Sequence, residues 1–477
     1  MSKIRERLHR WRAISRRRVA LVVARLLGFI VVSFYMAFPE IKRFSTHVPG
    51  NPGDAFLVLA LVRWGAQRSS SLYSGFWQGP MFSSGHNVMA YTETFLPLTV
   101  PFRLINAVTG SPIVAFNVLY IASWVLCLEC TYLLLARLTS CRSASLVGSL
   151  AFTFSTIRLA QTGHYQLMFA IGIPLGLLLL FRLFDRPSIG RAIALSAVLA
   201  GQFLTTAYYG LILTVSVAVI AAVMTIRRRR DPTIRTIITS LSAGFVALLI
   251  LVGPVALRYS QVQATSHTRD AYPAEFALRL GDLRTAAPLS KHLDGISFLT
   301  NDSSSRSGES FAYIGFFSAL MVAASLIGLI ASRRVRTTFA ERRAELVAVV
   351  GVGAISFAIA VGRGPILGIR MPFYDIARAV IPGVRSMLAI VRLFVFTQLA
   401  LVAVATTGLV AFLRWNGSRA LRLTFCAALA GIILFESAQG IPITRVPEVR
   451  PDSVYATLAK LPNDGVVAEL PLAPRGL

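Results

Sequence analysis

A few short segments carry acidic, histidine and arginine side chains in a chain that otherwise holds little charge. The first is Asn51-Pro52-Gly53-Asp54, which follows the first long apolar run and opens a second one. Asp54 has two compatible roles: it can cap the N-terminus of the following helix, or it can act as a general base on a hydroxyl group. A cap also fixes the carboxylate in place, so Asp54 is the candidate catalytic residue.

Glu93 is the second acid of the same polar stretch and precedes Pro97. It can hold a hydroxyl of a bound molecule or share a metal ion with Asp54, and the alternative is a helix cap near the membrane interface. Cys127 and Cys130 have a metal-ligand spacing, but no second pair accompanies them and they lie inside an apolar run. No metal site is therefore predicted from them.

Arg158 and His164 stand in a polar segment between two apolar runs, with Gly163 beside the histidine. Charged and polar groups at a membrane border are costly unless they face a cavity. They suit the binding of a phosphate or a sugar, and the alternative is a polar hairpin wetted by solvent.

Further along, Glu309 precedes a span, Tyr374 lies in the last long polar segment, and Arg385 and Arg392 stand at the mouth of the next span. Arginines at such a place can pair with the phosphate of a polyprenyl carrier. Anchoring to lipid headgroups is the competing role. We take all four as candidate substrate-binding residues.

The elements that position these residues are membrane helices. Hydrophobic residues make up 55% of the 477 residues and charged ones only 14%, about half the charged share of a soluble domain. Runs of about 20 apolar residues can each cross a bilayer. Eleven are expected, near 19–38, 112–136, 143–161, 167–184, 190–208, 210–226, 237–256, 313–332, 345–361, 391–413 and 419–436.

The net charge of +27 follows the same pattern. Arginines cluster in the short connections between spans, which is typical of cytoplasmic loops and not of a nucleic-acid-binding surface. The basic segment 1–18 and an uncleaved first anchor then lie inside, and the C-terminus outside. Within the first outer loop, 95–108 is expected to be an interfacial or re-entrant helix pair.

Three regions are predicted: the cytoplasmic segment 1–18, the membrane domain 19–436 and the outer segment 437–477. The membrane domain has long outer loops at 39–111, 257–312 and 362–390, which hold most of the histidines and candidate residues. The outer segment suggests a helix and then a strand, so we expect the chain to stop inside a small α/β domain. Glu129 lies within the second span, where we favour a protonated acid or a packing partner.

Several motifs together resemble one family. They are Gly53-Asp54 with Trp64, Tyr91-Thr92-Glu93 before Pro97 and Pro101, Ala115-Phe116-Asn117, Phe152 to Ser155 with Arg158 and Gly163-His164-Tyr165-Gln166, Glu309 before Tyr313-Ile314-Gly315, Pro382 with Arg385 and Arg392, and Val454-Tyr455 with Val467 to Pro471. Their order resembles bacterial integral membrane glycosyltransferases of the GT-C type, related to protein mannosyltransferases and lipid A aminoarabinose transferases. The resemblance covers nearly the whole chain.

The resemblance implies a GT-C helical bundle in the plasma (inner) membrane and a polyprenyl-phosphate-linked sugar donor. It further implies transfer to an envelope glycan, lipid or protein at the outer face, with Asp54 as base or acceptor orienter and inversion at the anomeric carbon. Ala55 stands where many GT-C enzymes have a second acid, which makes a divalent metal doubtful, and no other cofactor is expected. The tail is also shorter than in relatives.

Two other functions remain open at this stage. A transporter or flippase of lipid-linked glycans also explains a basic chain with many spans, although transporters usually show internal repeats and none is found here. A non-catalytic scaffold for an envelope assembly complex fits the single acid after Gly53 and the short tail.

Overall fold

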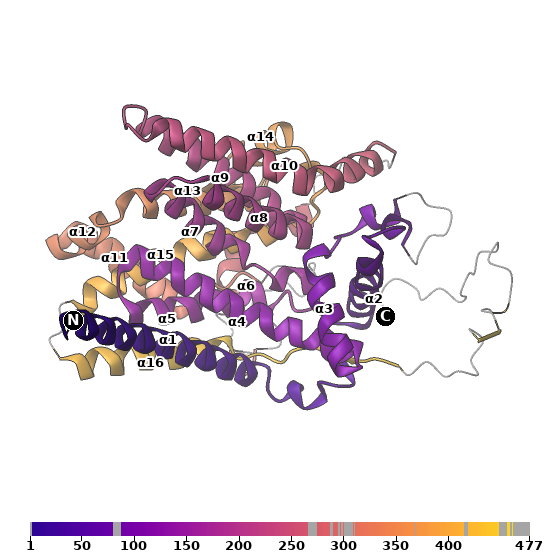
Figure 1. Ribbon diagram of the computed structural model, residues 1–477, viewed down its shortest axis with the longest axis horizontal. Helices are drawn as coiled ribbons and strands as arrows, with labels where there is room; N and C mark the ends of the chain where they lie inside the picture. The colour runs from indigo at the N-terminus through magenta and orange to yellow at the C-terminus, as the bar shows by residue number, and fades with distance from the viewer. Residues whose placement is uncertain are drawn as a thin grey trace.

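The computed structural model describes residues 2–79, 87–265, 274–286, 290–293, 311–366, 368–414 and 418–447, together with residues 296, 299, 309, 456, 457 and 460. Helices dominate it (Figure 1). The α-helices are α1 (Ser2–Met36), α2 (Pro52–Arg68), α3 (Leu96–Thr109), α4 (Pro112–Thr139), α5 (Arg142–Thr153), α6 (Thr156–Leu159), α7 (Gly172–Asp185), α8 (Ile189–Thr205), α9 (Ala207–Arg227), α10 (Ile234–Thr265), α11 (Phe316–Ala331), α12 (Arg333–Ala340), α13 (Arg343–Val361), α14 (Phe373–Val380), α15 (Phe394–Leu413) and α16 (Arg419–Ser437). The strands are β1 (His47–Pro49), β2 (Pro365–Ile366), β3 (Ile369–Arg370) and β4 (Ile443–Arg445).

The prediction of a polytopic α-helical membrane protein is confirmed, but the number of eleven spans is not. Eight helical segments of the described residues are long and apolar enough to cross a bilayer, or nine if α11 and α12, which meet at 109°, form one span. The difference lies partly in α5 and α8, with 12 and 17 residues. At 1.5 Å per residue they reach about 18 and 26 Å, less than the roughly 30 Å of a hydrocarbon core.

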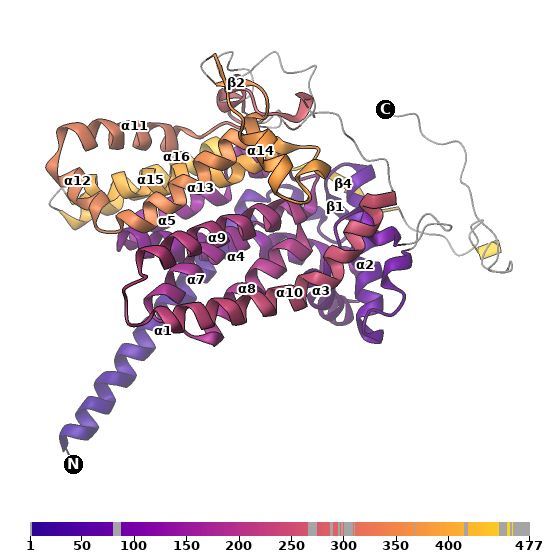
Figure 2. The same cartoon turned by 90° about the horizontal axis from the view of Figure 1, so that it is seen from above.

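The helices run between two ends of the molecule with different chemistry. α12 and the arginine-rich α9–α10 turn lie at one end, here called the basic end, whereas α2 and α3 lie at the other, here called the site end (Figures 1 and 2). Arginines of the basic end pair with acids of neighbouring helices: Arg137 donates to both Asp185 and Glu345 at 2.6–3.1 Å. The gathering of basic connections at one end agrees with the charge pattern, and which end faces the cytoplasm stays a prediction.

Two predictions concern single segments. The expected helix pair over 95–108 is corrected: residues 96–109 form one helix, α3, with Pro97 in its first turn and Pro101 within it. For Glu129 the structure agrees with the alternative of a packing partner, because the Arg25 guanidinium donates to it through Nε at 2.7 Å and through a second nitrogen. This pair joins α1 to α4 within the apolar region.

Segments distant in sequence meet at the site end through two short strands. β1 pairs antiparallel with β4, with His47 opposite Arg445 and Pro49 opposite Ile443. The predicted helix and strand of the tail, 452–461 and 465–472, lie outside the described residues except for 456, 457 and 460. The β1–β4 ladder therefore joins the segment between α1 and α2 to the chain that follows α16.

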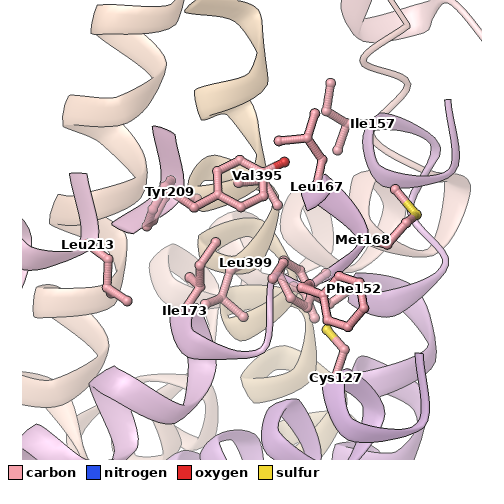
Figure 3. Packing of buried hydrophobic residues seen from close by; sticks show 14 of the residues in the cluster. Cys127, Phe152, Ile157, Leu167, Met168, Ile173, Tyr209, Leu213, Val395 and Leu399 are labelled. Atoms are coloured by element: carbon pink, nitrogen blue, oxygen red, sulfur yellow. The ribbon is translucent and has the colours of Figure 1, made fainter. Parts of the chain in front are cut away.

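The hydrophobic core lies where α4, α5, α7, α9 and α15 pack together. Figure 3 shows part of it, with Cys127, Phe152, Met168, Tyr209 and Leu399 in one cluster. Cys127 and Cys130 are both buried and unoxidised, and Cys127 packs against this cluster, so the cysteine spacing serves packing. The core continues up to α6, the short helix that precedes the candidate site.

Candidate functional site

Asp54 lies in the first turn of α2, at the site end. The N-cap of this helix is Asn51, not Asp54, and the Asn51 side chain forms no capping hydrogen bond in the described structure. A carboxylate in the first turn is stabilised by the unpaired N–H groups and the dipole of the helix. The Asp54 side chain is 56% exposed, so it is accessible to a substrate.

A close backbone contact brings Asp54 to the histidine of a distant segment. Gly50 has φ +108°, and a Cβ atom there would lie 3.1 Å from Cα of Gly163. Only glycine allows this conformation and this approach. The Gly50 amide also donates to the Pro442 carbonyl, and the Thr444 hydroxyl donates to the Gly50 carbonyl, both at 2.7 Å. The chain around β4 thus holds Gly50 against Gly163.

His164 lies between two carboxylates. Its Nε2 atom is 3.5 Å from Oδ2 of Asp54 and 3.7 Å from Oε1 of Glu309. Burial lowers the pKa of His164 below its ordinary value, the guanidinium of Arg392 lowers it further, and the two carboxylates oppose this shift. His164 is therefore mainly neutral at neutral pH, and its single ring proton can be shared with either acid.

Glu309 and Arg392 form a two-point ion pair beside the histidine. Arg392 donates through Nε to Oε2 of Glu309 at 2.7 Å, and a terminal guanidinium nitrogen donates to Oε1. The side chains are only 11% and 10% exposed. The guanidinium also lies over the ring of Tyr208, 5.4 Å from its centre. Arg392 is thus held by two partners, Glu309 and Tyr208, and it neutralises one of the two acids that flank His164.

Glu93 approaches the same group from the segment between α2 and α3. Its Oε2 atom accepts a hydrogen bond of 2.8 Å from the amide of Ala207, the first residue of α9. Burial raises the pKa of Glu93 to about 7, although the Ala207 amide, Arg392 and Thr206 lower it. Glu93 is therefore a carboxyl group that titrates near neutral pH within the field of Arg392.

Arg158 takes a different position from the other candidates. Its guanidinium is buried and donates to the carbonyls of Thr153 at 2.6 Å and Met168 at 2.8 Å. These carbonyls flank the irregular segment between α5 and α7 that carries His164. The structure thus places Arg158 as a clip that closes this segment, with its donors directed at the backbone.

Tyr374 and Arg385 lie on other elements, in and directly after α14. Tyr374 is buried on α14, and Arg385 is exposed and donates to the carbonyl of Arg378 at 3.4 Å. The structure thus joins Asp54, His164, Glu309 and Arg392 by contact. Glu93 is linked to this group by the electrostatic effect of Arg392 on its pKa. Their role in binding stays a prediction.

Sequence reasoning missed the groups that hold this cluster together. Tyr208 carries Arg392 on its ring, and its hydroxyl accepts from the Leu388 amide at 2.8 Å. Gly50 and Thr444 set the path of the loop before Asp54. A glycine four residues before the acid was the one available signal, because such glycines often mark close backbone approaches.

The arrangement suits proton transfer better than metal binding. An exposed carboxylate stands next to a neutral imidazole, which in turn faces a carboxylate neutralised by arginine. No group of three or more histidine, cysteine, aspartate or glutamate side chains in the described part of the chain is arranged to hold a metal ion. The cluster can accept a proton from a hydroxyl at Asp54 and share it through His164.

A cavity adjoins the cluster on the side of β1. It measures about 40 Å³ and is lined mainly by apolar side chains of the α1 end, α4 and the chain around β4. Tyr120, in its wall, donates to the hydroxyl of Thr162, next to the Gly163–His164 turn. Tyr120 thus links the wall of the cavity to the segment that carries His164.

The fold and the site together define a multi-pass α-helical membrane protein with an acid–histidine–arginine cluster at one end of its bundle. The chain belongs to the family described as "Domain of unknown function (DUF6311)", whose model matches residues 85–432. This range includes every candidate site residue except Asp54. No curated protein matches the chain. The structure is similar to the apo crystal structure of ArnT from Cupriavidus metallidurans, with 14% identity and a TM-score of 0.36 over 82% of this chain and 78% of that one.

Proposed function

We propose that this protein is a membrane glycosyltransferase that moves a sugar from a polyprenyl-phosphate donor to an acceptor hydroxyl of the cell envelope. The observation that carries the proposal is the contact of Asp54 with His164 at the exposed end of a membrane bundle. The family resemblance of the sequence motifs supports the choice of donor and acceptor. The site end would face the outside of the plasma membrane.

In the proposed reaction Asp54 orients the acceptor hydroxyl and takes its proton. The acceptor oxygen forms the new bond to the anomeric carbon as the bond from that carbon to the phosphate oxygen breaks. Inversion follows from attack on the face opposite the leaving group, and the polyprenyl phosphate leaves with the electron pair. The Asp54 to His164 distance of 3.5 Å exceeds a hydrogen bond in this state, and such distances often shorten when substrate binds.

The roles of the remaining groups would follow from their contacts. Arg392 is already paired with Glu309, so it would act on His164 through the electrostatic effect of its charge. Arg385 is exposed on the same connection and is better placed to meet the phosphate of a donor. Glu93, whose pKa is about 7, would bind a hydroxyl in its protonated or ionised form.

The test is transfer in proteoliposomes supplied with labelled polyprenyl-phosphate sugars and an envelope extract as acceptor source. Asp54→Asn keeps the shape of the side chain but removes the base, and loss of general-base catalysis lowers the rate by about 10²–10⁴-fold. Asp231→Asn, the same change at an exposed turn of the basic end, keeps the wild-type rate. Full transfer by Asp54→Asn would remove Asp54 from the mechanism, and lipid-linked sugar crossing the bilayer without a new glycosidic bond would replace the proposal with transport.

A further inference from the structure

A second, enclosed cavity lies among the segments that lead away from the cluster. It measures about 10 Å³, roughly the room of one water molecule or one small ion. Its walls come from the α5–α6 connection, the chain that enters α11, and helices α15 and α16. The lining residues are Ala151, Ser155, Thr156, Tyr313, Ile314, Gly315, Ser318, Gln398, Ile433, Glu436 and Ser437.

Glu436 supplies a carboxylate that has no basic partner among the described residues. Its Oε2 atom accepts from the Phe316 amide at 2.8 Å and from the Tyr313 hydroxyl at 3.3 Å. Its Oε1 atom lies 3.0 Å from the point where a side chain at Gly315 would begin. Glu436 forms no ion pair with the residues that the structure describes, and no lysine or arginine is among the cavity's lining residues.

Gln398 supplies a second oxygen, and this oxygen lacks a hydrogen-bond partner in the described structure. The side chain is 1% exposed, and its Nε2 atom donates to the Ile314 carbonyl at 3.1 Å. Its Oε1 atom is buried without a hydrogen-bond partner in the described structure. A buried acceptor left in this state costs about 1–3 kcal/mol. Gln398 binds the Ile314 carbonyl through Nε2 and the Glu436 carboxylate lies against Gly315, so the two side chains approach the same peptide unit.

Hydroxyl oxygens complete the set of groups around the cavity. Ser318 and Ser437 are both buried in its lining, as is Thr156. Carboxylate, amide and hydroxyl oxygens are the hard ligands that alkali and alkaline-earth cations accept. One carboxylate balances one positive charge, which favours a monovalent ion over a divalent one.

We infer that this cavity is a binding site for a small monovalent cation of the sodium type, held by Glu436, Gln398 and the surrounding hydroxyl groups. The cation provides the charge that the Glu436 carboxylate lacks and the partner that the Gln398 oxygen lacks. A neutral water would satisfy the hydrogen bond but leave the charge of the half-buried carboxylate uncompensated.

The site has a clear connection to the acid–histidine–arginine cluster through the chain. Thr156 precedes Arg158 and His164 on the clipped segment, Tyr313 follows Glu309, and Gln398 lies on the helix that Arg392 leads into. A bound cation would hold these three segments to one another. It would therefore stabilise the site without contacting the substrate.

The experiment uses the purified full chain in detergent, with thermal unfolding measured in NaCl, KCl, LiCl and N-methylglucamine chloride at equal ionic strength. The expected result is a saturable rise in unfolding temperature with Na⁺ that follows ligand linkage, together with binding of about one ²²Na⁺ per chain. Glu436→Gln and Gln398→Leu remove both effects. Glu341→Gln, which breaks an exposed pair with Arg414 at the basic end, leaves them intact.

Three outcomes would overturn the inference. They are equal unfolding temperatures in all four salts, Na⁺ stabilisation that persists in both cavity variants, or stabilisation of the wild-type chain by acid pH in place of Na⁺. If Glu436→Gln does not fold, Gln398→Leu decides the question by itself, because this substitution does not change the charge of the protein. Neither readout requires sugar transfer, so failure here is distinguishable from failure of the proposed function.

Discussion

Loss of Arg392 should destabilise the protein much more than an ordinary arginine would. Arg392→Met leaves the Glu309 carboxylate, which is 10% exposed, without its two donors, and breaking a buried pair in this way costs about 3–5 kcal/mol. Glu309→Met should cost a similar amount for the converse reason. The double variant buries no charge at either position, so it should cost no more than one single change, which gives a coupling energy of about 3 kcal/mol.

The assay is equilibrium unfolding in mixed micelles of the four proteins of this double-mutant cycle. A matched control is the Arg363–Asp375 pair, which has a contact of 2.8 Å but side chains 47% and 51% exposed. Solvent screening should reduce its coupling to about 0–1 kcal/mol. Equal coupling energies for the two pairs would refute the reasoning that burial makes the Arg392 pair important.

The same variant has a second consequence at His164. Arg392 lowers the pKa of His164 whereas Glu309 and Asp54 raise it. Arg392→Met should therefore raise the pKa of His164, as followed by NMR of protein labelled at the histidine rings. An unchanged or lower pKa in this variant would contradict the arrangement of charges described above.

Three further predictions concern groups around the site. The pKa of Glu93 in the folded state, about 7, exceeds the ordinary value of 4.5, so the folded state binds this proton more tightly and wild-type stability should fall as pH rises from about 4.5 to 7. Glu93→Gln should remove this pH dependence, a change of up to about 3 kcal/mol across that range. An identical pH profile of stability in the variant would refute the shift. Arg158→Lys keeps the charge but loses the two separate guanidinium nitrogens that donate to the two carbonyls, so it should lower the unfolding free energy by about 1.5–3 kcal/mol. An unchanged unfolding free energy would contradict this role of Arg158. Glu129→Gln should weaken the α1–α4 contact by about 2 kcal/mol and increase proteolysis near α1, while equal cleavage would count against the pair with Arg25.

Hydropathy and charge predicted the membrane class well because both are local properties of the sequence. Apolar runs and arginine clusters need no knowledge of distant contacts. The count of spans failed where length mattered: α5 stops at Thr153, and the chain then forms the irregular segment that carries His164. Apolar residues continue through this break, so the hydropathy pattern predicted a continuous span over 143–161.

The candidate site was harder to predict because its contacts join segments far apart in the chain. Residue type and exposure to a membrane border were enough to select Asp54, His164, Glu309 and Arg392, which the structure places in contact. Residue type did not separate Arg158 from these, since an arginine that clips backbone carbonyls looks the same in sequence as one that binds phosphate. Only the direction of its donors distinguishes the two.

The β1–β4 ladder affects the order in which the protein can be completed during synthesis. His47 pairs with Arg445, so the loop before Asp54 is synthesised about 400 residues ahead of its partner strand. At about 5–20 residues per second this interval lasts roughly 20–80 s. During that time neither the ladder nor the Thr444 bond to Gly50 exists to hold the loop. The acid would therefore reach its place beside His164 only after the last helix has entered the membrane, so a ribosome-bound intermediate would not yet have the assembled site.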